Sequence, residues 1–166
     1  MDTKPIQNAL TVMIPIKPEL ADMMREGLKK GPFDGGILDA VGTVHFARIF
    51  VFGKDNPAKI APNIAAIITS YDGDFAHYIQ DFVNHEGVAG FFDNFLLAVA
   101  DPEAKKCSPV KKNALRFAAL LQKYDATNPA NVWGVWYSAY PGKTVQNILH
   151  PPPSATKASP KATKSK

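Results

Sequence analysis

The stretch GTVHFARIFVF, residues 42–52, decides the fold, because most of its residues are β-branched or aromatic and glycines lie at both of its boundaries. Such a run predicts a strand. It also contains His45 and Arg48, two polar side chains in a segment otherwise suited to burial. Residues three apart in a regular strand point to opposite faces of a sheet. We therefore expect these two side chains to share a pocket only if a bulge intervenes.

The segments on either side complete an α+β pattern. Alternating apolar residues predict strands over 9–17, 62–71 and 131–140, and helical spacing predicts helices over 18–31, 72–99 and 108–123, the last capped by Ser108. The order is that of a ferredoxin-like β-α-β-β-α-β unit with an antiparallel sheet. A doubly wound parallel sheet would need a helix between the second and third strands, where only a short polar turn is found.

Composition separates a domain from a tail. Residues 1–150 are predicted to form one ferredoxin-like domain, and residues 151–166, rich in Pro, Ala, Ser and Lys, to form a disordered tail. The formal charge of +4 belongs to four lysines of that tail, because residues 1–150 contain 15 basic and 15 acidic residues. We therefore expect no nucleic-acid partner. The sequence shows no apolar run of about 18 residues, so we expect no membrane span and a cytoplasmic location.

Both faces of the predicted strands 42–52 and 131–140 are apolar, so both faces of the sheet need to be covered. Two helices can cover only one face of the predicted sheet. A second copy of the chain on the other face, giving a homodimer, is the simplest cover. The alternative is that the helical stretch near 88–99 folds over the open face.

The polar side chains near the central strand are the candidate site. Arg48 shares a strand face with aromatic residues, and a buried guanidinium needs an anion, either Asp72 or Asp74 from SYDGD or a ligand carboxylate. His45 is either a hydrogen-bonded structural residue or a ligand. Asp74 suits a helix N-cap as well as a ligand site. Cys107, the single cysteine, lies in a polar loop and is expected to be exposed.

Three stretches, VGTVHFARIFVF, IITSYDGDFAHYIQDF and WYSAYPGKTVQNI, resemble a family of small bacterial dimeric α+β barrel proteins with H-F-A-R and Y-D-G-D-F motifs. The resemblance covers about residues 40–147. It implies a ferredoxin-like fold and a context near peroxidase, cytochrome P450 or lipid-oxidation proteins. The wider superfamily includes haem peroxidases and cofactor-free oxygenases, but this family supplies no established reaction.

These observations predict a small-molecule-binding protein, with oxidoreductase activity on an apolar or haem-like ligand as the more specific hypothesis. His45 and Arg48 are the predicted catalytic residues: Arg48 would anchor an anionic group, and His45 would act as a proton donor or as the axial ligand of a haem. The predicted ligand-binding residues are Tyr71, Asp72, Asp74, Trp136 and Tyr140. The alternative is a non-catalytic scaffold or accessory partner of an oxidative enzyme.

Overall fold

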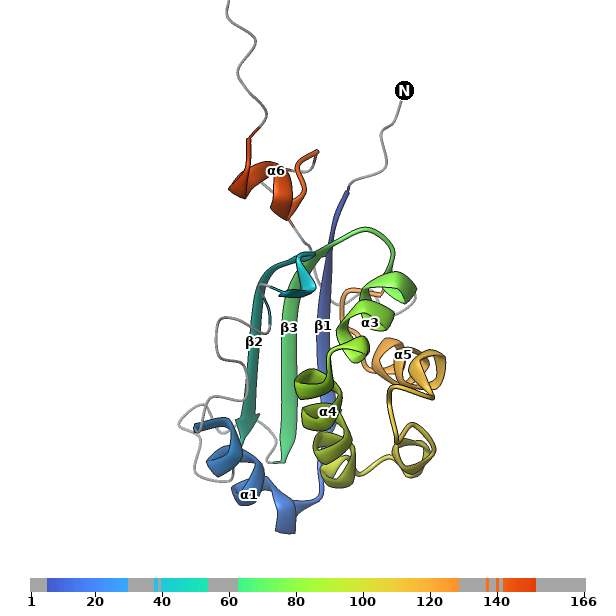
Figure 1. The fold of residues 1–166 in the computed structure, drawn as a ribbon. Helices are drawn as coiled ribbons and strands as arrows, with labels where there is room; N and C mark the ends of the chain where they lie inside the picture. The colour runs from blue at the N-terminus through green and yellow to red at the C-terminus, as the bar shows by residue number, and fades with distance from the viewer. Residues whose placement is uncertain are drawn as a thin grey trace, which may run out of the picture.

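Three antiparallel strands with helices packed on one face form the fold, seen in a computed structural model that describes residues 6–29, 38, 40–53, 63–128, 137, 140 and 142–151 (Figure 1). The elements, in chain order, are β1 (Gln7–Pro15), α1 (Pro18–Lys29), β2 (Val44–Phe52), β3 (Ile64–Asp72), α3 (Phe75–Asn84), α4 (Glu86–Ala98), the 3-10 helix η1 (Pro102–Lys106), α5 (Ala114–Lys123) and α6 (Val145–Leu149). The predicted α+β class is confirmed. The predicted strand over 131–140 and the tail beyond 151 lie outside the described residues, except for Tyr137 and Tyr140.

The sheet has the order β1-β3-β2, and both neighbours of β3 run antiparallel to it. β1 and β2 are therefore parallel to each other, connected through α1, with β3 between them. The far edge of β1 is covered by residues 124–126, since Met13 N donates to the Tyr124 carbonyl at 3.0 Å and Ala126 N donates to the Thr11 carbonyl at 2.7 Å. This contact occupies the outer edge of β1 at Thr11–Met13.

The core lies between the sheet and helices α3, α4 and α5 (Figure 1). Leu10, Val12 and Ile14 of β1 are fully buried. Aromatic rings link the helices to the sheet and to one another: Tyr71 stacks on Tyr78 with centroids 4.1 Å apart, and Phe92 lies 5.0 Å from Phe117. Burial of these rings supplies much of the apolar area that stabilises a domain of this size.

Two helix boundaries differ from those predicted. The stretch 72–99 forms two helices that meet at His85, rather than breaking at the glycines that follow. α5 begins at Ala114, not after Ser108. The Ser108 hydroxyl donates to Asp93 Oδ1 at 2.8 Å, and this bond holds the loop against α4 instead of capping a helix.

Candidate functional site

The predicted site corner lies where β2 begins and β3 ends, at the end of the sheet next to α6 (Figure 1). Val44 pairs with Tyr71 and Phe46 with Ser70, so His45 is the extra residue of a β-bulge. Its Nε2 lies 2.8 Å from Asp72 Oδ1. An ionised carboxylate can only accept, so the imidazole donates this bond. The bulge is thus what brings His45 to Asp72.

Asp72 also fastens α6 to the sheet. Its second oxygen, Oδ2, accepts a hydrogen bond from Val145 N at 2.7 Å, at the first residue of that helix. A carboxylate is favoured at a helix N-terminus because the first backbone N–H groups have no partner within the helix. Gly73 follows at φ +84°, a conformation that favours glycine. The Asp72 side chain is 9% exposed and that of His45 is 15% exposed, so the pair is shielded but reachable.

A hollow of about 260 Å³ adjoins His45. Its lining is mainly apolar and comes from the start of β2, the segment before it, and α6: Leu38, Gly42, Val44, His45, Phe46, Ala47, Val145, Gln146 and Leu149. An imidazole oriented by a carboxylate and facing such a hollow can accept or donate a proton.

The structure separates the other predicted site residues from this pair. Arg48 is exposed, and its guanidinium lies over the Phe50 ring, 5.6 Å from the centroid. The predicted burial of Arg48 is therefore wrong, and its two candidate carboxylate partners bond elsewhere: Asp72 to His45 and the α6 backbone, and Asp74 to the start of α3. An exposed guanidinium remains hydrated and does not need the anionic partner that burial would require.

The remaining predicted residues have separate positions. Asp74 caps α3, accepting from His77 N at 3.0 Å, and the capping interpretation is confirmed. Tyr71 is buried against Tyr78, and burial raises the pKa of its phenol to about 12. Tyr140 is exposed, with Lys143 Nζ 5.6 Å from its ring centroid. Trp136 lies outside the described residues.

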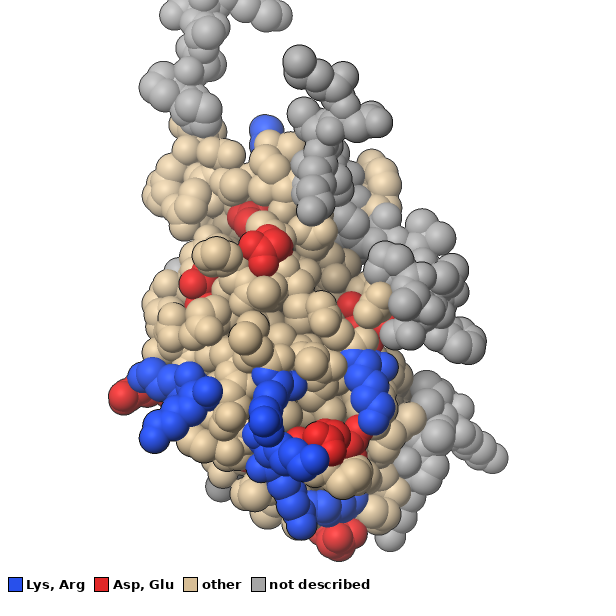
Figure 2. Space-filling model, turned by 90° about the vertical axis from the view of Figure 1, so that its right-hand side faces the viewer, with Lys and Arg blue, Asp and Glu red and all other residues tan. Residues whose placement is uncertain are grey.

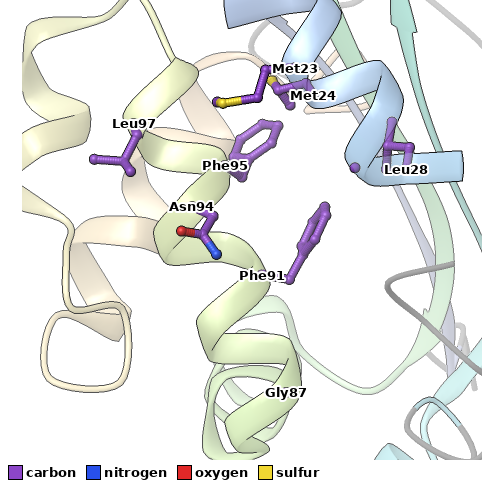
Figure 3. Close-up of a pocket in the computed structure, with 9 residues that line it drawn as sticks. Met23, Met24, Leu28, Gly87, Phe91, Asn94, Phe95 and Leu97 are labelled. Atoms are coloured by element: carbon purple, nitrogen blue, oxygen red, sulfur yellow. The ribbon is translucent and has the colours of Figure 1, made fainter. Parts of the chain in front are cut away.

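A larger pocket that the sequence did not predict lies near the other end of the sheet, between α1 and α4. We call it the α1–α4 groove. It encloses about 540 Å³ and is lined by Met23, Met24, Gly27 and Leu28 of α1 and by Gly87, Phe91, Asn94, Phe95 and Leu97 of α4. In Figure 3 the two methionines of α1 lie beside Phe95, and Phe91 projects from α4 toward α1. The helical spacing of Met23, Met24 and Leu28 predicted an apolar stripe on α1. It did not predict that a groove would open between this stripe and α4.

The groove differs chemically from the His45 hollow. Asn94 supplies the only polar side chain among the described residues that line it, and none of them carries a charge. Met23 and Leu97 are 56% and 61% exposed, which is high for such apolar side chains. The groove can therefore receive an apolar body and offer one amide to a polar group.

The described residues include no group of three or more His, Cys, Asp or Glu side chains that could hold a metal ion. None of the described helices combines the length and apolar character needed to cross a bilayer. Comparison of the chain with models of protein families, with curated proteins and with solved structures gives no match.

Proposed function

We propose that the protein binds a small, largely apolar molecule in the α1–α4 groove. The observation that carries the proposal is a pocket of about 540 Å³ whose described lining residues are uncharged and mainly apolar. This volume lies within the range of roughly 300–1,000 Å³ that is usual for ligand pockets. Methionine side chains adapt to irregular ligands, which suits Met23 and Met24 to this role.

The lining also limits the chemistry of the ligand. A charged ligand would lose hydration on entry without gaining an ion pair from the described lining residues, which costs free energy. The Asn94 amide can donate to or accept from a neutral group. The favoured ligand therefore has an apolar body with a hydroxyl or carbonyl group, such as a medium-chain alcohol.

The experiment that tests this proposal fills the groove with a side chain. Gly27 lines the groove, and a Cβ at this position would meet no atom within 4 Å. Gly27→Leu should lower the affinity for the neutral dye Nile red by at least about tenfold. It should lower the affinity for 1-decanol, measured by displacement of the dye, by a similar factor.

Gly90→Leu is the matched control. Gly90 is also helical, a Cβ added there would likewise meet no atom within 4 Å, and the residue lies outside the groove lining. Both substitutions replace a helical glycine and should raise stability by about 0.5–1 kcal/mol. Lost binding in Gly27→Leu alone therefore cannot come from unfolding. Equal dye binding by the two variants would contradict the proposal.

A second candidate function, proton transfer, is favoured by the His45–Asp72 pair. The carboxylate orients the imidazole beside a hollow that can admit a small substrate. Oxidoreductase activity is a more specific form of this proposal and stays a prediction. The non-catalytic alternative assigns the same pair to anchoring α6.

The geometry does not favour a haem at His45. Nε2 is already bonded to Asp72, and the adjoining hollow of about 260 Å³ is smaller than the usual range for bound ligands. An absorption spectrum before and after addition of haemin tests this. Unchanged free-haemin absorbance is the expected result, and a Soret band lost in His45→Ala would restore haem ligation.

We further propose that the chain has the ferredoxin-like topology and forms a homodimer through its sheet. The arrangement of β1 and β2 around β3 supports a split β-α-β unit. On the face away from the helices, Phe46 is 51% exposed, as an interface residue would be in an isolated chain. Light scattering after size exclusion should give twice the chain mass, and Phe46→Asp should give a monomer.

A further inference from the structure

Residues 1–150 have no net charge in total, but positive and negative residues are concentrated in different parts of the sequence. Residues 103–123 contain five lysines and Arg116 but one acidic residue, Glu103, a net charge of +5. The rest of residues 1–150 has 9 basic and 14 acidic residues, a net charge of −5. Figure 2 shows the helix-covered side of the molecule, where Lys and Arg side chains gather in the lower half.

Part of this basic segment surrounds a pocket of about 360 Å³ between η1 and α5, which we call the η1–α5 pocket. Lys106, Arg116 and Lys123 line it, together with Glu103 and the buried Cys107. Arg116 and Lys123 are seven residues apart in α5, two helical turns, so they lie on the same side of the helix. Three cations and one carboxylate thus surround one concave surface.

Of the three cationic side chains that line the pocket, two form ion pairs within the described part of the chain, and Arg116 is left to bind a ligand. Lys106 Nζ lies 2.7 Å from Glu103 Oε1, and Lys123 Nζ lies 2.6 Å from Asp101 Oδ2. Arg116 is exposed and makes no ion pair within the part of the chain that the structure describes. Its planar guanidinium can donate two parallel hydrogen bonds to an oxyanion.

Asp101 fixes the two walls of the pocket relative to each other. Asp101 accepts hydrogen bonds from Glu103 N at 2.9 Å, Lys123 Nζ at 2.6 Å and the Tyr124 hydroxyl at 2.8 Å. These bonds join the start of η1 to the end of α5, so the two walls keep their spacing. A site fixed before binding loses less free energy to ordering when a ligand enters.

We infer that the η1–α5 pocket binds a phosphate group, with Arg116 as the principal contact and Lys106 and Lys123 supplying further positive charge. A phosphate monoester carries about −1.5 to −2 at pH 7, opposite in sign to the Arg116 guanidinium and to the positive segment around it. This site lies apart from the α1–α4 groove and shares no lining residue with it. The ligand could be soluble or a phospholipid headgroup, and the test separates these sources.

The experiment uses the full chain and two probes. Inorganic pyrophosphate is titrated into the protein by calorimetry, and vesicles of phosphatidylcholine with or without phosphatidic acid are tested by co-sedimentation. Binding to pyrophosphate supports a soluble ligand, and binding to the acidic vesicles alone supports a headgroup. The absence of binding to either probe would overturn the inference.

Two variants locate the site. Arg116→Gln should weaken binding of the probe by about tenfold or more, because it removes the bidentate donor. Lys112→Gln removes the same charge from the same exposed segment, outside the pocket lining, and should change affinity by less than about threefold. An equal loss in both variants would show only diffuse attraction to a basic surface and would overturn the pocket assignment.

Discussion

His45 and Asp72 are joined by a hydrogen bond of 2.8 Å between Nε2 and Oδ1, although 27 residues separate them in the chain. The bulge at the start of β2 makes this bond possible, and the other oxygen of Asp72 holds the first backbone N–H of α6 at 2.7 Å. A single carboxylate thus connects two strands and a helix. The corner is a structural anchor whatever chemistry it performs.

We predict that Asp72→Asn will destabilise the protein by about 1–3 kcal/mol, because the amide cannot accept from both His45 and Val145 as the carboxylate does. Urea denaturation measures the loss, and hydrogen exchange should show reduced protection at the Val145 amide. Asp74→Asn is the control: it removes the same charge nearby, but Asn caps a helix as well as Asp, so the change should stay below about 0.5 kcal/mol. Equal effects of the two substitutions would contradict the role of Asp72.

Because of Asp101, we predict that the free energy of unfolding depends on pH in the acid range. Hydrogen bonds from Lys123 and the Glu103 amide lower the pKa of this carboxyl from 3.8 to about 2 in the folded protein. A lowered folded-state pKa stabilises the protein above the unfolded value, and that contribution is lost as the pH falls from about 3.8 to about 2. Asp101→Asn should therefore be less stable than the wild type at pH 7, with the gap closing across this interval. Urea denaturation at several pH values tests it, and a constant gap would contradict the account.

Cys107 should react slowly in the folded protein. The sequence predicted an exposed thiol in a polar loop, and this prediction is wrong: the side chain is buried and its Sγ donates to the Glu103 carbonyl at 3.4 Å. Burial raises the pKa of the thiol, which lowers the fraction of reactive thiolate. Modification by a disulfide reagent at pH 8 should be at least about a hundredfold slower than in urea. Similar rates in the two conditions would show that the thiol is accessible.

The sequence predicted the strands and most helices because alternation and helical spacing report which side chains face the core. β1, β2 and β3 are all at or near their predicted positions, and Asp74 caps α3 as expected. The late start of α5 was missed because the Ser108 hydroxyl could either cap a helix or bond to Asp93, a residue distant in the sequence. Local patterns do not distinguish between these partners.

The candidate site was harder to predict for a similar reason. His45 was singled out as a polar residue in an apolar strand, but its partner depended on a bulge that leaves no distinct mark in the residues 42–52. The α1–α4 groove depends on the separation of two helices, which their amphipathic patterns do not specify. The charge of residues 103–123 could be counted from the sequence, yet its concentration around one pocket required the fold.

The most direct test of the proposed function is a methyl NMR titration of the protein with 1-decanol. The chain has four methionines, of which Met23 and Met24 line the groove while Met13 lies in β1. Binding in the groove predicts saturable shifts of the Met23 and Met24 methyl signals, assigned by Met→Leu variants, with the Met13 signal unchanged. Signals that do not move, or that move together with Met13 without saturation, would contradict binding in the α1–α4 groove.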